Sequence, residues 1–450
     1  MKKILNLGRT TRVLSISTLA SLVRNLGRKI IPKPVFEFLQ PAYHLVLAYL
    51  AALVYCFPSR KIKVIGVTGT KGKSSTVYFL SRILEGAGYK TASISTIQFK
   101  IVEKESPNTL EMTMPGRFAI QSFLAKAVKA GCQFFVVEVS SQGVLQSRHR
   151  FINFDTAVFT NLAPEHIEAH GSFENYKKHK LKFFEYVKNN HVINKDDKYF
   201  QEFYNISAKN KIIYSANDYK NIKLGLLGDF NVANAASAIK TAEIYGVDPE
   251  RSKQVLEKIN ILPGRMELVD EGQSFKVIVD YAHTPDSMDA VYKSLKPKLD
   301  VGEKMICIFG ATGGGRDKWK RPEYGKISEK YCDEIILTDE DSYGEKLEEI
   351  LEQIETGFSR SESVKRKICK IFDRKEAIKK GIGLAKEGDI VIITGKGSQT
   401  NMMFANGKKI HFDDREIVRE TLKTLLRIHR GQTVENRKKL IDEILNNQPD

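Results

Sequence analysis

Residues 64–80 read VIGVTGTKGKSSTVYFL, and this stretch decides the architecture to be expected of the chain. A β-branched run ends in glycine, and apolar residues at helical spacing follow it. Gly69 and Gly72 let backbone N–H groups approach phosphate oxygens closely, and the start of a helix adds a favourable dipole. The stretch therefore predicts a strand, a phosphate-binding loop and a helix in succession.

The loop is a compressed form of the common nucleotide-binding pattern. That pattern would place its first glycine where Val67 stands. The polar side chains are still those that nucleotide phosphates need, since Lys73 can reach the outer phosphates and the Ser74 hydroxyl can bind Mg²⁺. The alternative is a glycine-rich turn without a ligand, but the strand before the loop and the helix after it favour a nucleotide site.

Apolar runs of strand length alternate with helical stretches along the rest of the chain. The first set comprises TASIST (91–96), FFVVEVSS (134–141) and TAVFTNL (156–162). After ILPGRMELV (261–269), the second set comprises FKVIVDYAH (275–283), KMICIFGATGGG (304–315), DEIILTDED (333–341) and DIVIITGKG (389–397). This alternation predicts an α/β fold with mostly parallel sheets, which bind ligands at the carboxyl ends of their strands.

The two sets predict two α/β domains with flanking segments. We expect a central ATP-binding P-loop domain over residues 61–261 and a Rossmann-like domain over residues 262–425. Residues 1–60 form a basic, partly apolar segment that we expect to be helical, and residues 426–450 form a tail.

Composition limits the partners and the compartment. The chain has 71 Lys and Arg against 54 Asp and Glu, a net charge of +17, which favours an anionic partner unless the surface is simply basic throughout. No nucleic-acid-binding module is visible, so we expect no nucleic acid. The five cysteines are scattered without a Cys-x-x-Cys pair. They suit the cytoplasm and argue against a disulfide framework or a zinc site.

The amino-terminal segment combines basic residues with a long apolar stretch. Seven basic residues punctuate apolar ones in the first 32 positions, and PAYHLVLAYLAALVYCF follows at 41–57. A stretch of this length is at the short limit for a membrane span. Two interpretations stay open: attachment to the inner face of the membrane, peripherally or through one short span, and a helix packed on the next domain.

Two further stretches carry candidate chemistry. Glu138 ends a buried strand, where a carboxylate is costly unless it is paired or bound to a metal. The stretch TNLAPEHIEAHGSFENYKKHKLKFF (160–184) contains two Glu-x-His-like groupings and a lysine-rich helix. Taken singly, each of Glu165, His166, Glu168 and His170 is better explained as a surface or core-edge residue, and Lys180 as part of a solvated basic face.

The order of the motifs resembles the Mur ligase family. These motifs are GTKGKSS (69–75), EVSSQG (138–143), NLAPEHIEAHG (161–171), GDFNVANAASA (228–238), LPGRME (262–267), DYAHTPDSM (280–288), GGGRDKWKRP (313–322) and GKG (395–397). Within the family the chain resembles the tripeptide synthetases, which add the third residue of the peptidoglycan stem. The resemblance runs from about Lys61 to Arg419.

The resemblance implies a nucleotide and metal site. ATP would be bound by Gly69, Thr70, Lys71, Gly72, Lys73, Ser74 and Ser75, and from across the cleft by Asn234, Arg265, Asp280 and His283. Two Mg²⁺ ions would be held by Ser74, Glu138, His166 and Lys180, the last as a carbamate. Lys73, His166 and Lys180 would be the catalytic residues, with the neighbouring lysines of Lys180 stabilising its carbamate.

The resemblance also implies a substrate site with departures from the family. The muramoyl-peptide would be bound by Thr113, Ser140, Gln146 and Arg148, and the amino acid by Arg316, Glu340, Asp341, Tyr343, Gly395 and Gln399. Met114 stands where many members have a second threonine. Glu340 to Tyr343 replace the Asp-Asn-Pro-Arg of diaminopimelate-adding members, and Gln399 replaces a glutamate. With Glu345, the acidic residues predict a preference for lysine over diaminopimelate.

We therefore expect an ATP-dependent amide ligase, monomeric, that joins a free amino acid to a muramoyl-peptide precursor through an acyl phosphate. About sixty residues precede Lys61, fewer than the uridine-nucleotide-binding domain of the family needs, so the resemblance does not extend to recognition of the uridine nucleotide. The alternatives are a ligase similar to folylpolyglutamate synthetase, one acting on a lipid-linked or polymeric acceptor, and, remotely, a basic ATPase that binds nucleic acid.

Overall fold

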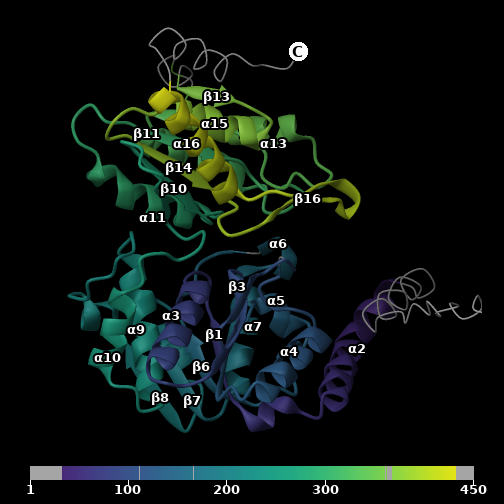
Figure 1. Cartoon of the computed structure of the whole chain (residues 1–450). Coiled ribbons are helices and arrows are strands. Elements are labelled where there is room, and N and C mark those ends of the chain that lie inside the picture. Colours follow the sequence, from purple (N-terminus) through teal and green to yellow (C-terminus); the bar gives the residue numbers. More distant parts are fainter. Residues whose placement is uncertain (1–32, 111, 166, 360, 362–366, 432–450) are drawn as a thin grey trace, which may run out of the picture.

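The computed structural model describes residues 33–110, 112–165, 167–359, 361 and 367–431. Two α/β units lie one above the other, and helix α2 (Lys33–Val54) projects from the side of the first unit (Figure 1). Each unit contains its own sheet with helices on both faces, which confirms the predicted fold class.

The first unit is built on a mostly parallel sheet. Among the described residues its strands are β1 (Lys63–Thr68), β2 (Thr91–Ile94), β3 (Gln98–Ile101), β4 (Lys104–Pro107), β5 (Phe134–Glu138), β6 (Phe154–Phe159), β7 (Asn190–Asn194) and β8 (Asn210–Tyr214). They follow the order β4-β3-β2-β5-β1-β6-β7-β8, with β3 and β4 antiparallel. Strand β1 lies in the middle, so the loop that follows it opens at the centre of the carboxyl edge.

Helices cover both faces of this sheet with separate apolar clusters. One face packs against α3 (Lys73–Gly86), α9 (Phe230–Glu243) and α10 (Pro249–Glu257). The other packs against α4 (Arg117–Lys129), α5 (Ser141–Leu145) and α7 (Phe173–Tyr186). The predicted strands and helices of this unit are therefore present, and β1 is buried on both sides, as its continuous apolar run requires.

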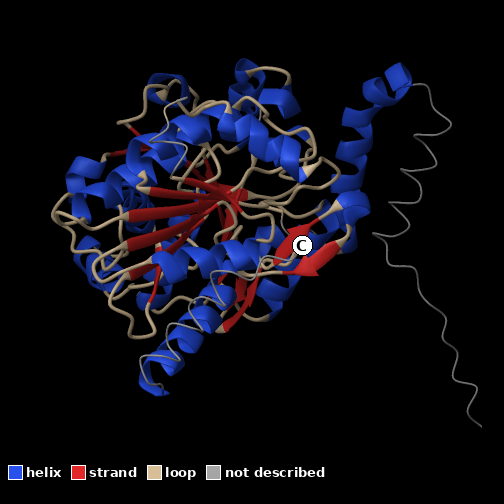
Figure 2. Ribbon diagram, turned by 90° about the horizontal axis from the view of Figure 1, so that it is seen from above, coloured by secondary structure: helices blue, strands red, loops and turns tan. Residues whose placement is uncertain are grey.

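The second unit repeats the plan with a smaller sheet. Its described strands are β9 (Glu267–Val269), β10 (Lys276–Asp280), β11 (Met305–Phe309), β12 (Glu334–Leu337), β13 (Ile368–Lys370) and β14 (Ile390–Thr394), in the order β13-β12-β11-β14-β10-β9. Only β9 is antiparallel within this sheet. Figure 2 shows the strands lying between layers of helices.

Helices α11 (Pro285–Leu295), α12 (Lys320–Tyr331) and α13 (Leu347–Glu355) pack on one face of the second sheet. Helices α15 (Arg374–Leu384) and α16 (Asp414–Gly431) pack on the other. A hairpin of β15 (Asn401–Met403) and β16 (Lys409–His411) reaches back towards the first unit (Figure 1).

Helix α2 packs on α4 through small side chains, because Ala48, Ala51 and Ala52 are buried between them. A short 3₁₀ turn, η1 (Pro58–Lys61), then leads into β1. In the part of the chain that the structure describes, no helix has the length and hydropathy to cross a membrane. The interpretation of residues 41–57 as a short span is therefore not supported.

One cysteine pair corrects an expectation from the sequence. Cys307 on β11 and Cys332 after α12 form a disulfide, with their Cα atoms 6.0 Å apart. The two cysteines are 25 positions apart, so no short sequence motif indicates that they pair. It forms because α12 returns the chain beside β11. No group of three or more His, Cys, Asp or Glu side chains that could hold a metal ion occurs among the described residues.

Candidate active site

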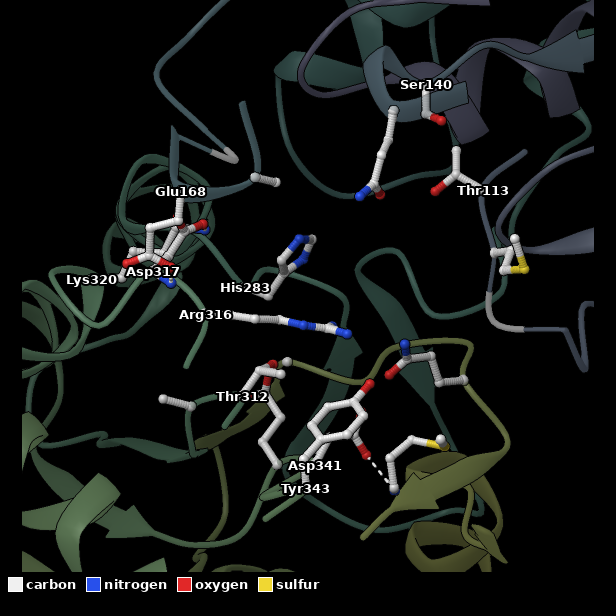
Figure 3. A pocket seen from close by; sticks show the side chains of 18 of the residues that line it. Thr113, Ser140, Glu168, His283, Thr312, Arg316, Asp317, Lys320, Asp341 and Tyr343 are labelled. Carbon is white, nitrogen blue, oxygen red and sulfur yellow. Dashed lines mark hydrogen bonds and ion pairs between the residues drawn. The ribbon is translucent and has the colours of Figure 1, made fainter. Parts of the chain in front are cut away.

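Two cavities lie between the units at the carboxyl edges of the two sheets. The loop cavity, about 330 Å³, is lined by residues 70–75 of the phosphate-binding loop and by the facing residues of the second unit. The outer cavity, about 770 Å³, lies beside it and is lined by Arg148, Arg316 and Glu340, among others (Figure 3). Thr113, Tyr281 and His283 line both cavities, so the two are adjacent at these residues.

The glycines of the loop are required by close contacts. Gly69 and Gly72 have φ angles of 152° and 78°, a region that favours glycine. A Cβ at Gly69 would collide with the Thr160 hydroxyl, and one at Gly72 would collide with the Asn234 side chain on α9. Asn234, predicted from the family pattern, is thus placed directly against the loop.

Lys73 begins α3 and turns back over the loop. Its Nζ donates to the carbonyl oxygens of Gly69 at 3.0 Å and Thr70 at 2.7 Å. The ammonium group is therefore held at the amino end of α3, where the helix dipole also attracts anions. This arrangement provides a concentrated positive site for phosphate oxygens.

Glu138 and Ser74 supply the hard oxygen donors of the loop cavity. The Glu138 carboxylate is fully buried and accepts hydrogen bonds from Thr96, from its backbone N–H at 2.7 Å and from its hydroxyl at 3.1 Å. Both Glu138 and Ser74 line the cavity. A carboxylate and a hydroxyl beside a phosphate-binding loop suit Mg²⁺, which prefers oxygen ligands and shares them with phosphates. Thr96 was not predicted.

Lys180 lies behind the loop on α7. Its Nζ donates to the Gly69 carbonyl oxygen at 2.6 Å and lies 4.6 Å from the centre of the Tyr176 ring. Burial and the nearby charge of Lys73 hold the pKa of Lys180 well below its ordinary value. The side chain does not belong to the lining of the loop cavity, so the main chain of the loop separates it from the space beyond.

The lysines that were expected to support a carbamate on Lys180 are paired elsewhere or exposed in this structure. Lys177 pairs with Glu174 and Glu202, at 3.0 Å each, and Lys178 and Lys182 are exposed. Helical spacing places Lys178 and Lys182 on other faces of α7, whereas Lys177, one turn before Lys180, is held by its two glutamates. The cation that acts on Lys180 is Lys73 of the loop.

Arg265 faces the loop from the second unit. Its guanidinium lies 4.1 Å from the centre of the Tyr281 ring, and Nη2 donates to Ser74 Oγ at 3.3 Å. The buried Nη1 has no hydrogen-bond partner among the described residues. A buried, unpaired guanidinium nitrogen at a phosphate-binding loop fits an anionic ligand. Tyr281, which supports Arg265, was not predicted.

Asp280 ends β10 and shapes the turn beside Arg265. Its two carboxylate oxygens accept from the backbone N–H groups of Met266 and Ala282, at 2.7 Å each. Burial nevertheless raises the pKa of Asp280 above its ordinary value. The carboxylate lines the loop cavity, as predicted, and also fixes the backbone that carries Arg265 and Tyr281.

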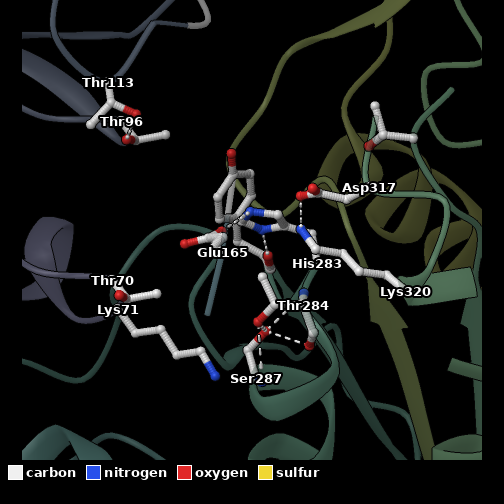
Figure 4. Close-up of polar contacts among 12 residues, drawn as sticks. Thr70, Lys71, Thr96, Thr113, Glu165, His283, Thr284, Ser287, Asp317 and Lys320 are labelled. Atoms are coloured by element: carbon white, nitrogen blue, oxygen red, sulfur yellow. Dashed lines mark hydrogen bonds and ion pairs between the residues drawn. The ribbon is translucent and has the colours of Figure 1, made fainter. Parts of the chain in front are cut away.

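His283 lines both cavities, and Figure 4 shows it beside Glu165 of the first unit. Its Nδ1 contacts the Tyr281 carbonyl oxygen at 2.8 Å, and its Nε2 lies 3.4 Å from Glu165 Oε1 of the first unit. Glu165 belongs to the stretch singled out in the sequence, but its pairing with His283, 118 positions away, could not be predicted. His166, expected to bind metal, lies outside the described residues.

One wall of the outer cavity comes from the first unit and includes Thr113, Ser140 and Arg148. We call it the acceptor wall, because it is where the muramoyl-peptide is expected to bind. Thr113 Oγ1 lies 3.3 Å from Thr96 Oγ1, and Ser140 caps α5 by accepting from the Gly143 N–H. Arg148 donates to the Met114 carbonyl oxygen and to Gln146 Oε1. Gln146 does not line the cavity; it orients Arg148 instead.

Met114, the departure noted in the sequence, is 1% exposed. Its Sδ lies beside the backbone of Gly143 at the start of α5. The residue lines the outer cavity, and its sulfur atom packs against α5.

The opposite wall of the outer cavity comes from the second unit. The Arg316 guanidinium stacks 4.7 Å from the centre of the Tyr343 ring, and the exposed side chain extends into the cavity below His283 (Figure 3). Glu340 is buried, and burial raises its pKa to about 7. It accepts a hydrogen bond from Thr312 Oγ1 at 3.2 Å.

The expectation of three acidic groups in this wall needs correction. Asp341 Oδ1 accepts from Lys396 Nζ at 2.8 Å, and the lysine is fully buried. Glu345 pairs with Arg321 at 2.9 Å and does not belong to the lining. Cations thus pair with two of these three carboxylates, and Glu340 is the one of the three that lines the cavity without an ion pair among the described residues. Lys396 lies in the GKG motif, but its partner was not predictable.

Gly395 and Gln399 complete this wall. Gly395 has a φ of 112°, and a Cβ there would collide with the Glu340 carboxylate. Gln399 Oε1 lies 3.4 Å from Lys396 Nζ, so the residue supports the Asp341–Lys396 pair from the other side. Both line the outer cavity.

Comparisons with known proteins agree with this geometry. Residues 67–221 match the model of the Mur ligase middle domain, and residues 264–397 match that of the Mur ligase, glutamate ligase domain. The chain is 36% identical over 407 residues to the UDP-N-acetylmuramoyl-L-alanyl-D-glutamate–2,6-diaminopimelate ligase of Syntrophomonas wolfei, covering 84% of this chain and 81% of the relative.

A second relative carries a name without a stated amino acid. The UDP-N-acetylmuramyl-tripeptide synthetase of Treponema denticola is 34% identical over 423 residues, covering 84% of this chain and 79% of the relative. Among solved structures, one of a UDP-N-acetylmuramoyl-L-alanyl-D-glutamate–2,6-diaminopimelate ligase is 28% identical with a TM-score of 0.56. The match covers 86% of this chain and 83% of the chain in the solved structure.

Proposed function

The chain belongs to the Mur ligase family of ATP-dependent, ADP-forming ligases, and on this premise we propose that it adds the third amino acid to a UDP-N-acetylmuramoyl-dipeptide-like precursor of peptidoglycan. One observation supports the proposal: the loop cavity and the outer cavity are adjacent, because Thr113, Tyr281 and His283 line both. The terminal phosphate of ATP and the carboxylate of an acceptor can therefore meet at this junction.

The first step activates the acceptor carboxylate. One of its oxygens attacks the γ-phosphorus of ATP, the bond to the β-phosphate oxygen breaks, and an acyl phosphate and ADP form. Lys73 and Arg265 approach the phosphates from opposite sides and offset the charge that spreads over the phosphoryl oxygens. Mg²⁺ held by Ser74 and Glu138 would supply further neutralisation of the phosphate charge.

The second step forms the amide. The neutral α-amine of the amino acid attacks the acyl carbon, phosphate leaves, and the amine loses its proton. Arg316 is exposed in the outer cavity and has the guanidinium geometry that binds an α-carboxylate. The contacts between the units, such as Glu165 with His283, close the junction against water, which would hydrolyse the acyl phosphate.

The amino acid is proposed to be a diamine acid such as L-lysine. Tyr343 occupies the position of the arginine in diaminopimelate-adding members, and its ring lies under Arg316. A tyrosine cannot form the bidentate pair with a second carboxylate that an arginine forms. Glu340 instead offers a single acidic group to a side-chain ammonium.

The function is tested by phosphate release from ATP with a panel of acceptors. The panel contains a UDP-muramoyl-dipeptide, a lipid-linked precursor and a folate, each with a mixture of amino acids. We expect release to require both the muramoyl-dipeptide and an amine. Lys73→Ala should reduce turnover at least about a hundredfold, while Lys178→Ala, on the exposed face of α7, serves as control. Release that needs no amine would contradict the proposal.

The choice of amino acid is tested by competition between L-lysine and meso-diaminopimelate. We expect kcat/KM to favour lysine, and Tyr343→Arg to shift the ratio towards diaminopimelate by about one to two decades, the value of one charge-assisted bond. A wild-type preference for diaminopimelate would overturn the proposed specificity and leave the proposed reaction intact.

A further inference from the structure

Helix α2 is apolar on every side, yet one side is uncovered. Between Leu39 and Phe57 the sequence contains no Asp, Glu, Lys or Arg. Its small residues pack on α4, while the large ones on the other side are exposed: Leu45, Val46, Tyr49, Leu50, Leu53 and Val54, with exposed fractions from 38% to 55%. A helix that is hydrophobic all round is normally buried in a core or a bilayer. The uncovered side, called here the α2 face, therefore requires a covering partner.

The α2 face is a continuous stripe. Positions 45, 46, 49, 50, 53 and 54 follow the three- and four-residue spacing of one helix side. Figure 1 shows α2 at the side of the first unit, and the six side chains of the stripe are exposed. Continuous exposed apolar surface of this kind marks an interaction site.

The charges around α2 indicate the class of partner. The 32 residues that precede α2 contain seven Lys and Arg and no Asp or Glu, among many apolar residues. At the other end of the helix Arg60 and Lys61 are exposed. Apolar side chains between groups of cations match the two layers of an anionic membrane surface, in which headgroups bind cations and the acyl boundary accepts apolar groups.

A chain of side-chain contacts connects α2 to the outer cavity. Tyr43 of α2 interacts electrostatically with Arg117 at the start of α4, and Arg117 donates to the Gln146 carbonyl oxygen. Gln146 in turn orients Arg148, which lines the outer cavity. Helix α2 is thus connected through Arg117 and Gln146 to a residue of the acceptor wall.

We propose that the α2 face, together with the basic residues before it, docks the protein peripherally on an anionic lipid surface. The helix lies in the plane of the interface with Leu50, Leu53 and their neighbours in the acyl boundary. The contact goes beyond the proposed reaction and does not depend on it, because the α2 face contains no residue of either cavity.

The experiment is flotation of the full chain with vesicles. One set contains phosphatidylcholine alone and the other a mixture of phosphatidylcholine and phosphatidylglycerol. We expect flotation with the anionic set, weakened by salt. The double variant Leu50→Glu/Leu53→Glu should reduce the floated fraction about tenfold, since it places charges in the acyl boundary. The variant Arg24→Gln/Arg28→Gln/Lys29→Gln should reduce the preference for anionic vesicles.

The matched control is a double variant that introduces two glutamates at exposed apolar positions away from α2. Val301→Glu/Leu384→Glu replaces two exposed apolar residues of the second unit and should float like the wild type. Ligase activity in detergent-free solution should be unchanged in Leu50→Glu/Leu53→Glu, which shows that this variant folds.

Two outcomes would overturn the proposal. Equal flotation of the wild type and the Leu50→Glu/Leu53→Glu variant would show that the α2 face does not contact lipid. If the wild type does not float, sedimentation velocity decides what covers the face. A dimer that this variant converts to a monomer would assign the α2 face to a second copy of the chain, and a monomer in both cases would leave it without an intermolecular partner.

Discussion

At the scale of single residues, Lys180 shows how burial prepares a side chain for chemistry. The amine is enclosed by Tyr176, the Gly69 carbonyl oxygen and the neighbouring Lys73. Desolvation and the like charge both favour the neutral form, so the pKa lies well below that of a free lysine. A neutral amine is the form that reacts with carbon dioxide. The family pattern predicted the residue, but the sequence alone described Lys180 as one of several surface lysines.

We predict that Lys180 carries a carbamate when carbon dioxide is present. Lys180→Ala should lose nearly all turnover, because the anionic group is missing, and short-chain carboxylic acids should partly restore it. Lys178→Ala, on the exposed side of the same helix, is the matched control and should retain activity. Labelled carbon dioxide and carbon NMR provide the direct measurement. Absence of both the carbamate signal and the rescue would contradict the prediction.

Glu340 and Glu345 are close in sequence and opposite in their pH behaviour. Burial raises the pKa of Glu340 from 4.5 to about 7. Burial also opposes ionisation of Glu345, but hydrogen bonds from Arg321 and from the Gly315 N–H hold its pKa at about 2. The folded state therefore binds an extra proton at Glu340 between about pH 4.5 and 7, and the free energy of unfolding falls as pH rises through that window.

We predict that Glu340→Gln removes this pH dependence. From about pH 5 to pH 8 the variant should gain stability relative to the wild type, by at most about 3 kcal/mol, since one pKa unit corresponds to about 1.4 kcal/mol. For Glu345→Gln the difference from the wild type should stay constant over the same range, because that carboxyl ionises well below it. Chemical denaturation at several pH values measures both. Parallel curves for the wild type and Glu340→Gln would show that Glu340 is ionised throughout.

At the scale of elements, the strand–loop–helix of residues 64–80 was predictable because its signals are local. The apolar run, the glycines and the helical spacing act within a few residues of each other. The antiparallel strands β3 and β4 were missed: β4 is fully exposed and carries no apolar alternation. Strand β13 and the hairpin of β15 and β16 are only three residues long each, too short for periodicity to identify.

We predict that Gly72→Ala weakens ATP binding at least about tenfold, because the added Cβ meets Asn234 and the backbone has a positive φ. Gly88→Ala is the matched control: its φ of 94° is equally unfavourable, but no atom lies within 4 Å of the added Cβ. Both variants should lose some stability, and only Gly72→Ala should lose nucleotide affinity. Calorimetric titration with ATP distinguishes them, and equal affinities would refute the role of the Asn234 contact.

At the scale of the whole molecule, the site depends on contacts that join the two units. Ser74 with Arg265, Glu165 with His283, and Glu168 with the Asp317 N–H each pair residues far apart in the chain. The sequence could indicate that both units contribute, since motifs of each resemble one family. It could not give these pairings, because no local pattern encodes which side chains face each other across a cleft. For the same reason the neutralisation of Asp341 by Lys396 was not predicted.

The ion pair of Lys71 and Asp286 provides a test of whether the cleft between the two units closes. Asp286 can be replaced without changing a residue that lines either cavity. Lys71 Nζ of the loop lies 3.6 Å from Asp286 Oδ2 at the start of α11, and the carboxylate is mostly exposed. Exposed ion pairs contribute little stability, about 0 to 1 kcal/mol. Charge reversal should therefore leave the units folded while replacing an attraction across the cleft by a repulsion.

We predict that Asp286→Lys opens the cleft and separates ATP consumption from ligation. The radius of gyration with ATP bound should increase in small-angle scattering, and more phosphate than amide product should form, because water reaches the acyl phosphate. High salt should reduce both effects by screening the repulsion. Asp289→Lys makes the same change one turn along α11, where Asp289 contacts Tyr331 and Lys330 within the second unit, and should leave the ratio of phosphate to product near one. If the two variants behave alike, the Lys71–Asp286 contact does not hold the cleft closed.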